Sequence, residues 1–398
     1  MKRIHIGRRA ALAGGVAAFA SPAVLRAQNE PIKLATLTPL TGAGGSYGPA
    51  MAKVAASVVE EVNKAGGLLG RRVVLVSEDD QTSPEPAVRA ARKLIDVDKV
   101  VAIMGTWASS VTTAVAPLCW ESKTFLCTVS GADSITQLPH QGFLIRTQPN
   151  STLQVSRVGE FILSLGAKKV FTMIPQTPFT QATFDILNAV LPKGGATHQS
   201  LIYDDKKTTY RTEVDQALRA SPDLILANGY TPDSIVLLKD LYRAGFKGKI
   251  LGFAYSINQK LIDQIGQPEV VEGVYTFAPS PTEGSTAYER VKAAVGSANP
   301  DPYTCQVYDH TNMVLMSMAF AKEASGTAIK DNIRKITQGG GKSVDNAADG
   351  IKAIAAGEKV DYTGASGPCD FDAKGDILDC KFRYEQIKSG KFTVVKIA

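Results

Sequence analysis

The fold is decided by the stretch Val100-Val101-Ala102-Ile103-Met104-Gly105-Thr106-Trp107-Ala108-Ser109-Ser110. Its apolar half predicts a buried strand, and the helical pattern of residues 111–120 begins directly after it. Gly105 turns the chain between the two, and Ser109 and Ser110 stand where the unpaired N–H groups of a helix begin. Because such a helix start favours an anion, the stretch predicts a ligand site at the end of a strand.

A second segment, residues 124–134, repeats this order one strand–helix unit later and contains Gly131 and Asp133. The carboxyl ends of neighbouring parallel strands meet at one edge of a sheet, so both segments predict one crevice. The first segment offers hydroxyl groups and the second offers a carboxylate. The alternative is that these polar side chains serve only as helix N-caps.

Short apolar runs alternate with helical patterns from residue 31 onward, which is typical of parallel βαβ units in the α/β class. Predicted strands cover residues 32–38, 72–77, 100–104, 125–129, 169–174, 198–203, 224–227, 250–253, 271–276 and 392–397. So many strands exceed one open sheet, and residues 146–150 break the pattern midway. We therefore predict two doubly wound parallel-sheet lobes joined by a multi-strand hinge.

The predicted lobes are discontinuous in sequence. Helical patterns and then a hairpin around residues 373–375 follow the Pro-rich turn near residue 279. We assign residues 31–149 plus 279–364 to lobe 1, and residues 150–278 plus 365–398 to lobe 2.

The first residues predict an export signal. Arg8 and Arg9 precede a weakly apolar run over residues 10–20, and small residues near 26–28 are typical of a cleavage site. The run is too short for a membrane span, and the paired arginines favour the twin-arginine route. A basic tail is the alternative. We expect residues 1–27 to be removed and the mature protein to be periplasmic.

Charge argues against a nucleic-acid partner. The formal net charge is +6 at pH 7, but the predicted signal carries five basic residues and no acid, which leaves about +1 in the mature chain. Binding a polyanion needs a clustered excess of positive charge. No run of about twenty apolar residues follows the signal, so we expect the mature protein to be soluble.

The five cysteines lack the C-x-x-C spacing of zinc or redox sites. Cys369 and Cys380 flank the predicted hairpin, and in an oxidising compartment they are candidates for a disulfide, with a reduced pair as the alternative. The other three, Cys119, Cys127 and Cys305, lie in apolar surroundings typical of a core. The sequence predicts no metal site and no cofactor.

Catalysis is poorly supported. Ser109 would need a histidine base, and no G-x-S-x-G elbow surrounds it. The glycine-rich loop after the first strand carries Gly42 and Gly44 but has Tyr47 where a dinucleotide fingerprint needs its third glycine. Tyr47 is better explained as a ring that covers a ligand, or as simple loop packing.

Aromatic side chains follow several predicted strands. Trp107 does so in lobe 1, and Phe179, Tyr230 and Tyr255 do so in lobe 2. Each alone is typical of core or loop packing, but their shared position at strand ends predicts an aromatic-lined cleft between the lobes.

Taken together, these segments resemble the periplasmic type I solute-binding proteins of ABC importers, in the branched-chain amino acid (Leu/Ile/Val) binding group. The resemblance extends over residues 31–398 and rests on residues 32–42, 47–48, 63–70, 79–84, 105–110, 131–133 and 367–376. It implies that Ser109 holds a ligand carboxylate, with help from the carbonyl near Gly131. It also implies that residue 133 contacts the ligand carboxylate and ammonium, and that aromatic rings close over the ligand: Tyr47, Phe179 and Tyr230.

Two departures from the family pattern bear on the ligand. Asp133 stands where the family usually has threonine, and Ala254-Tyr255 stands where an amino-acid binder usually supplies an acidic partner for the ammonium group. Either Asp133 has taken over the ammonium, or the ligand lacks an α-ammonium group.

The expected function is capture of a small amino-acid-like, carboxylate or amide solute by hinge closure, and its delivery to an ABC permease and ATPase. The predicted binding residues are Tyr47, Trp107, Ser109, Ser110, Gly131, Asp133, Phe179, Tyr230 and Tyr255. We expect a monomer without enzymatic activity. The alternatives are a ligand sensor that signals to a kinase or chemoreceptor, and a periplasmic hydrolase that uses Ser109.

Overall fold

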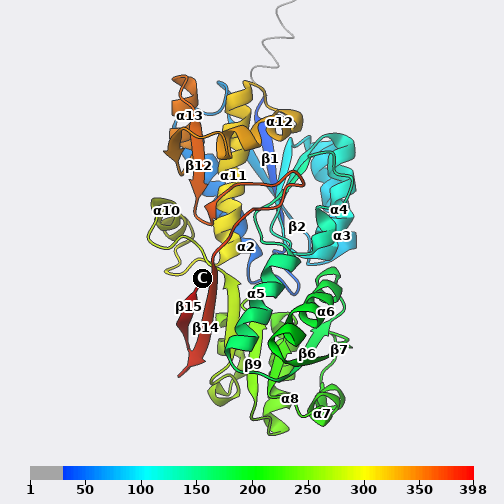
Figure 1. Cartoon of the computed structure of the whole chain (residues 1–398). Helices are drawn as coiled ribbons and strands as arrows, with labels where there is room; N and C mark the ends of the chain where they lie inside the picture. Colours follow the sequence, from blue (N-terminus) through cyan, green and yellow to red (C-terminus); the bar gives the residue numbers. More distant parts are fainter. Residues whose placement is uncertain (1–29) are drawn as a thin grey trace, which may run out of the picture.

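The structure, a computed structural model, describes residues 30–398, so the predicted export signal lies outside the described residues. Alternating strands and helices form two α/β lobes, one above the other in Figure 1. The predicted α/β fold with two largely parallel sheets is confirmed.

The sheet of lobe 1 has five parallel strands in the order β2-β1-β3-β4-β5. Helices cover both faces, which is why its central strands are almost wholly buried and have continuous apolar sequences. The strands are β1 (Ile32–Thr38), β2 (Val73–Asp79), β3 (Ala102–Thr106), β4 (Phe125–Thr128) and β5 (Leu144–Arg146). Their connections are α2 (Gly48–Lys64), α3 (Pro84–Arg92), the π-helical turn η1 (Lys93–Asp98), α4 (Ser109–Ser122) and the 3₁₀ turn η2 (Asp133–Ile135).

The sheet of lobe 2 has seven strands in the order β15-β14-β10-β9-β8-β6-β7. Five are parallel, and the last two pair antiparallel at one edge. The strands are β6 (Lys169–Pro175), β7 (Thr197–Tyr203), β8 (Leu224–Ala227), β9 (Lys249–Phe253), β10 (Tyr275–Pro279), β14 (Phe382–Lys388) and β15 (Lys391–Ile397). The helices are α5 (Ser151–Ser164), α6 (Pro178–Val190), η3 (Leu191–Gly194), α7 (Arg211–Arg219), α8 (Thr231–Arg243), α9 (Gln259–Ile265) and η4 (Pro268–Val270).

After β10 the chain returns to lobe 1 and adds four helices and a three-stranded sheet in the order β11-β12-β13. These elements are α10 (Thr286–Val295), α11 (Pro302–Ala321), α12 (Gly326–Thr337), β11 (Lys342–Val344), α13 (Ala347–Ala355), β12 (Val360–Gly364) and β13 (Gly367–Pro368). Helix α11 is buried along nearly its whole length. Its buried Asp309 accepts hydrogen bonds from the Tyr362 hydroxyl and the Ala365 N–H, both at 2.8 Å, which fix the end of β12 against the helix.

The last crossing between the lobes lies further along the chain than the predicted residue 365. Residues 365–377 stay with lobe 1, where β13 pairs with β12 and the Ile377 N–H donates to the Arg146 carbonyl at 3.1 Å. The chain joins the sheet of lobe 2 only at β14. The predicted boundary is therefore corrected, because this segment is held by β5 rather than by lobe 2.

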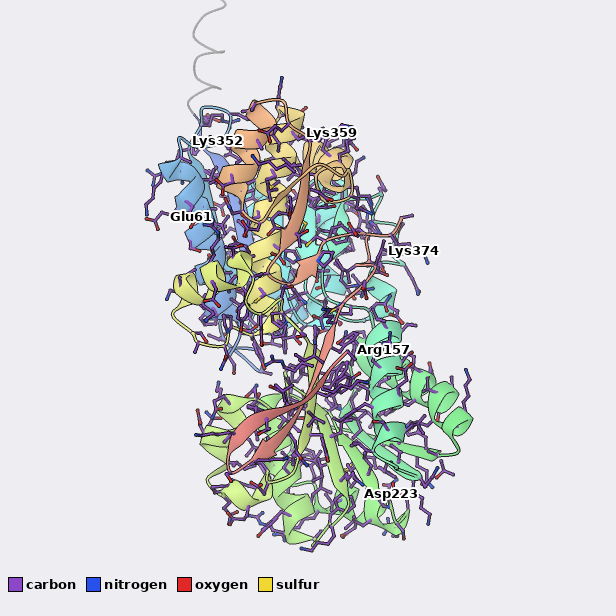
Figure 2. The ribbon with its side chains drawn as sticks, turned by 60° about the vertical axis from the view of Figure 1, so that its left-hand side comes forward. Glu61, Arg157, Asp223, Lys352, Lys359 and Lys374 are labelled. Atoms are coloured by element: carbon purple, nitrogen blue, oxygen red, sulfur yellow. The ribbon has the colours of Figure 1, made fainter. Side chains whose placement is uncertain are left out.

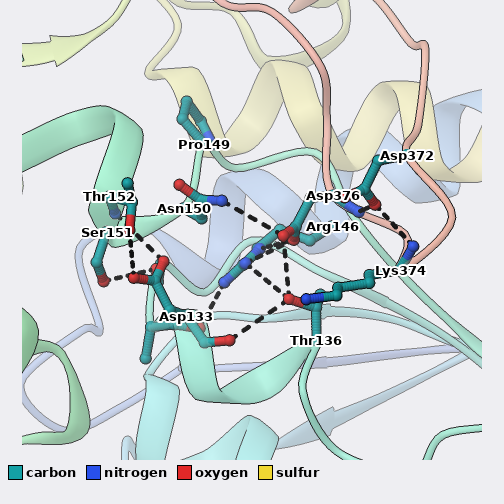
Figure 3. Close-up of polar contacts among 12 residues, drawn as sticks. Asp133, Thr136, Arg146, Pro149, Asn150, Ser151, Thr152, Asp372, Lys374 and Asp376 are labelled. Atoms are coloured by element: carbon teal, nitrogen blue, oxygen red, sulfur yellow. Dashed lines mark hydrogen bonds and ion pairs between the residues drawn. The ribbon is translucent and has the colours of Figure 1, made fainter.

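A buried ion pair explains that attachment. The guanidinium of Arg146, at the end of β5, is fully buried and is held by Asp376, with the Arg146 Nε at 2.8 Å from a carboxylate oxygen. Figure 3 shows Thr136 and Asn150 contributing to the same network, with distances of 3.1 and 3.3 Å to Asp376. The pair joins the predicted hairpin to the strand that precedes the first crossing.

The predicted disulfide between Cys369 and Cys380 is not formed, and all five cysteines are free. Cys369 belongs to the apolar core of lobe 1, whereas Cys380 packs against a core of lobe 2. The two residues lie on opposite sides of the last crossing, so their side chains face different cores. Cys119, Cys127 and Cys305 are buried in the core of lobe 1.

Charged side chains lie mainly on the surface. Figure 2 shows examples on both lobes, such as Glu61 and Asp223, which are exposed. Within residues 30–398, no helix combines the length and apolar character needed to cross a bilayer. The same residues contain no group of three or more His, Cys, Asp or Glu side chains suited to a metal ion.

Candidate ligand-binding cleft

The first wall of the cleft is the start of α4, directly after β3. Gly105 has φ 87°, and a Cβ there would lie 2.8 Å from Thr38 Cγ2, so the turn needs glycine. Helix α4 has no side-chain cap at its N-terminus. The Ser109 Oγ accepts the Ala132 N–H at 3.2 Å, which leaves its own hydrogen free to donate. Lobe 1 therefore presents a hydroxyl and uncapped N–H groups to the cleft.

Lobe 2 supplies the opposite wall from the starts of α6 and α8 and from the turn after β9. Together the lobes line a partly open cavity of about 60 Å³. Its lining is Trp107, Ala108, Ser109, Val129, Gly131, Gln148, Gln154, Ile174, Pro175, Thr177, Phe179, Asn228, Gly229, Tyr230, Tyr255 and Tyr303. No lining residue carries a formal charge.

Aromatic rings dominate the cavity, with Trp107 at their centre. Its ring centroid lies 5.7 Å from that of Tyr230, 6.0 Å from Tyr255 and 5.8 Å from Tyr303. Burial raises the pKa of all three tyrosine hydroxyls well above the usual value, so they stay protonated. The cavity thus combines apolar faces with neutral hydroxyl groups, which suits a planar or aliphatic ligand body.

Gly131 allows two other lining groups to approach closely. A Cβ at this position would lie 3.0 Å from Gln154 Nε2 and 3.0 Å from Phe179 Cε2. The Gly131 carbonyl accepts the Ser151 hydroxyl at 2.9 Å, at the start of α5. This carbonyl is thus engaged with lobe 2, although the residue itself lines the cavity.

Tyr47 lies beside the cavity rather than in its lining, and it joins the two lobes. Its ring packs on Trp107 with centroids 5.5 Å apart. Its hydroxyl donates to the Ala254 carbonyl at 3.2 Å and accepts from Asn258 Nδ2 at 2.8 Å, both in lobe 2. We call this contact the Tyr47 latch. It joins the two lobes through hydrogen bonds.

Beyond Tyr255 and Tyr303 lies a larger groove of about 730 Å³ between the lobes, beside α10 and β14. Tyr47, Asn258 and Gln154 also line this groove. Tyr255, Tyr303 and Gln154 line both spaces, so they lie between the small cavity and the groove.

Asp133 does not line the cavity, contrary to the sequence expectation. Its carboxylate faces the start of α5, where it accepts the Thr152 N–H at 3.2 Å and the Thr152 hydroxyl at 2.7 Å (Figure 3). A carboxylate is favoured at a helix N-terminus by the free N–H groups and the helix dipole. Ser110 is also outside the lining. Both residues are removed from the candidate site.

The other predicted residues surround one cavity: Trp107, Ser109, Gly131, Phe179, Tyr230 and Tyr255. Sequence reasoning missed Gln148, Gln154, Asn228 and Tyr303. The sequence carries a signal that could have identified Gln148, because this residue lies in the segment 146–150 that breaks the strand–helix pattern. Tyr303 had no comparable signal, since it comes from the first turn of α11, far along the chain.

Comparison with known proteins places this architecture in a family. Residues 31–391 match the periplasmic binding protein family. The chain belongs to this family. Its members bind solutes outside the cytoplasm, which agrees with the cleft described above.

Among the relatives, a Pseudomonas aeruginosa protein named "Amino acid binding protein" is 25% identical over 292 residues, 71% of this chain and 76% of that protein. The Halobacterium salinarum "Chemotactic signal transduction system substrate-binding protein BasB" is 25% identical over 356 residues, 86% of this chain and 84% of the relative.

Solved structures share the fold. The leucine-binding protein LivK from Thermotoga maritima gives a TM-score of 0.77 at 22% identity, covering 92% of this chain and 98% of that chain. A solute-binding protein of an ABC transporter from Rhodopseudomonas palustris, in complex with 4-hydroxybenzoate, gives 0.76 at 16% identity, with 93% and 97% covered.

Proposed function

We propose that this protein captures a small solute outside the cytoplasm and delivers it to the permease and ATPase of an ABC importer. The observation that carries the proposal is the aromatic, uncharged cavity built from both lobes. Because each lobe supplies only part of the lining, full contact with a ligand requires the lobes to close. A transporter can then distinguish loaded from free protein by its shape.

The recognised group of the solute is a carboxylate or carboxamide, bound at the start of α4. Ser109 and the uncapped N–H groups of α4 donate hydrogen bonds there. No acidic side chain lines the cavity to receive an α-ammonium group, and Asp133 is engaged by Thr152. We therefore favour a solute without an α-ammonium group, whose aromatic or apolar body lies against Trp107 and Tyr230.

Isothermal titration calorimetry of the purified protein tests this proposal. The panel contains benzoate, 4-hydroxybenzoate, benzamide, isovalerate, leucine and phenylalanine. We expect at least one carboxylate or amide without an ammonium group to bind with a Kd in the range of about 1 µM. Ser109→Ala is expected to weaken that binding about tenfold, the loss of one hydrogen bond to a charged group. The proposal would be contradicted if no solute of the panel bound and no small molecule co-purified with the protein.

Export of the chain is part of the same proposal. In residues 1–27, basic residues are followed by an apolar run and then by small residues, which is the order typical of an export signal. The paired arginines favour the twin-arginine route. Mass spectrometry of the protein from the periplasm is expected to find an N-terminus near residue 28. Replacing Arg8 and Arg9 by lysine is expected to stop export by the twin-arginine route.

Sensing is the second candidate function, and the likeness to BasB favours it. The same lobe closure would then be read by a chemoreceptor or kinase. Deletion of the gene separates the two candidates. Loss of uptake of the bound solute supports transport, whereas loss of a chemotactic response with unchanged uptake supports sensing.

A further inference from the structure

Three buried glutamines form a chain of side-chain amides that runs from lobe 1 into the cavity. Gln306 Nε2, on α11, donates to Gln148 Oε1 at 2.8 Å. Gln148 Nε2, in the first crossing, donates to Gln154 Oε1 at 3.0 Å. Gln154 Nε2, on α5, donates to the Pro149 carbonyl. The three residues are 1%, 4% and 2% exposed, respectively, so water does not compete for these bonds. We call them the amide chain.

The direction of the amide chain is fixed by its last acceptor. The Pro149 carbonyl oxygen accepts hydrogen bonds and cannot donate them, so Gln154 must turn its NH₂ group toward it. Gln154 Oε1 then faces Gln148, which must in turn present its own NH₂ group. Reversing any one amide would place two oxygens or two NH₂ groups against each other in a buried site.

Each Nε2 carries two hydrogens, and for Gln148 and Gln154 only one of them has an acceptor within the described residues. Both side chains line the cavity. Gln154 Nε2 lies next to Gly131, and Ser109 is hydrogen-bonded to the adjacent Ala132. The unused N–H group of Gln154 and the Ser109 hydroxyl thus lie near the same short segment of lobe 1, and Gln148 is hydrogen-bonded to Gln154.

We propose that Gln148 and Gln154 are specificity-determining residues that donate hydrogen bonds to the carboxylate of the solute. This inference rests on the proposed function and narrows the recognised group of its ligand to a carboxylate. A carboxylate accepts at about four lone-pair sites, which matches two amide N–H groups, one hydroxyl and the start of α4. The donors are neutral, and a carboxylate is charged, so each bond is charge-assisted.

The same arrangement disfavours a carboxamide. The NH₂ group of a carboxamide would face the donors of the amide chain and find no acceptor among them. The Asn228 side chain is already engaged, because its oxygen accepts the Phe253 N–H at 3.3 Å and its nitrogen donates to the Tyr255 hydroxyl at 2.8 Å. A carboxamide NH₂ group at that oxygen would have to share it with the Phe253 N–H. A site built to satisfy one polar group rejects an analogue that leaves buried groups unpaired.

The matched ligands benzoate and benzamide test the proposal by calorimetry, together with the solute that co-purifies with the protein, identified by mass spectrometry. We expect the wild type to favour the carboxylate by about tenfold or more. Gln154→Met and Gln148→Met keep the side-chain volume and remove the donor, and each is expected to weaken carboxylate binding by about tenfold while changing benzamide binding less. Gln154→Glu places a carboxylate against the ligand carboxylate and is expected to reverse the preference.

Gln199→Glu on β7 is the matched control, because this residue is exposed and lies outside the cavity lining. It is expected to bind as the wild type does. Thermal unfolding of each variant checks the fold, and the ratio of the two affinities stays informative when a variant is partly unfolded, since both ligands then lose the same fraction of sites.

The proposal is overturned if both methionine variants bind the carboxylate within about twofold of the wild type, or if the bound solute lacks a carboxylate. In that outcome a solute still binds with lobe closure, and the proposed function stands. If no solute binds at all, the proposed function fails together with the inference.

Discussion

Replacing Tyr47 by phenylalanine removes the Tyr47 latch while keeping the ring on Trp107. The lost contacts are the donation to the Ala254 carbonyl and the acceptance from Asn258 Nδ2, at 3.2 and 2.8 Å. Asn258 Nδ2 keeps Thr231 Oγ1 as an acceptor at 2.9 Å, so it is not left unpaired. The two contacts together contribute about 1–2 kcal/mol to closure of the lobes.

That free energy corresponds to a shift of about 5- to 30-fold in the equilibrium between open and closed protein. If the free protein is mostly open, the apparent Kd of the solute rises by the same factor. If it is mostly closed, the closed fraction falls instead. The packing of the lobe cores does not change, because the aromatic ring stays in place. The melting temperature is therefore expected to change little.

Calorimetry and small-angle X-ray scattering on the same samples measure both quantities. Tyr242→Phe serves as the control, because Tyr242 is 47% exposed and lies outside the cavity lining. If Tyr47→Phe leaves both the Kd and the closed fraction within about twofold of the wild type, the latch does not contribute to closure and the reasoning is wrong.

Three further predictions concern stability and affinity. Asp376→Ala leaves the buried Arg146 guanidinium unpaired and is expected to lower the free energy of unfolding by about 3–5 kcal/mol, measured by urea titration. Asp133→Ala removes an acceptor at the start of α5 and is expected to cost about 1 kcal/mol of stability while changing the solute Kd less than about twofold, which calorimetry checks. Burial lowers the pKa of His310 from 6.5 to about 3, so the unfolded chain binds a proton below pH 6.5 that the folded protein does not. The free energy of unfolding of the wild type is expected to fall by about 2 kcal/mol between pH 6.5 and pH 5, and His310→Gln is expected not to show this loss. Equal dependence of the free energy of unfolding on pH in the two proteins would contradict this prediction.

Local sequence patterns predicted the strand ends well because they depend on neighbouring residues only. The order of apolar run, glycine and hydroxyl in residues 100–110 is satisfied within one β3–α4 unit. Elements shaped by distant contacts were missed or displaced. The short strand β5 is held by the segment around Asp376, and the strand predicted over residues 271–276 begins instead at Tyr275, because Val271 and Val274 pack into a core beside α9.

The candidate site was predicted best where several residues indicate the same place. Trp107, Tyr230 and Tyr255 are each typical of core or loop packing when taken alone, but all three follow strands, and this shared position indicates the cleft that they line. Asp133 has two explanations, since a carboxylate at a strand end serves a ligand or a neighbouring helix equally well. The decision depends on where α5 begins in the other lobe, and the local sequence does not specify that distance.

The hydrogen-bonding roles of Gln148 and Gln154 could not be predicted from the sequence. A glutamine is a donor or an acceptor according to how its amide is turned, and this depends on Gln306 and the Pro149 carbonyl, which come from different elements. Closing the lobes over a buried arginine would leave an uncompensated charge until the solute bound, at a cost of several kcal/mol. Neutral amides carry a smaller cost of about 1–3 kcal/mol for each unpaired group. We therefore expect an uncharged donor set to let the lobes close and reopen readily, so that the hydrogen bonds to the proposed solute carboxylate determine how long they stay closed.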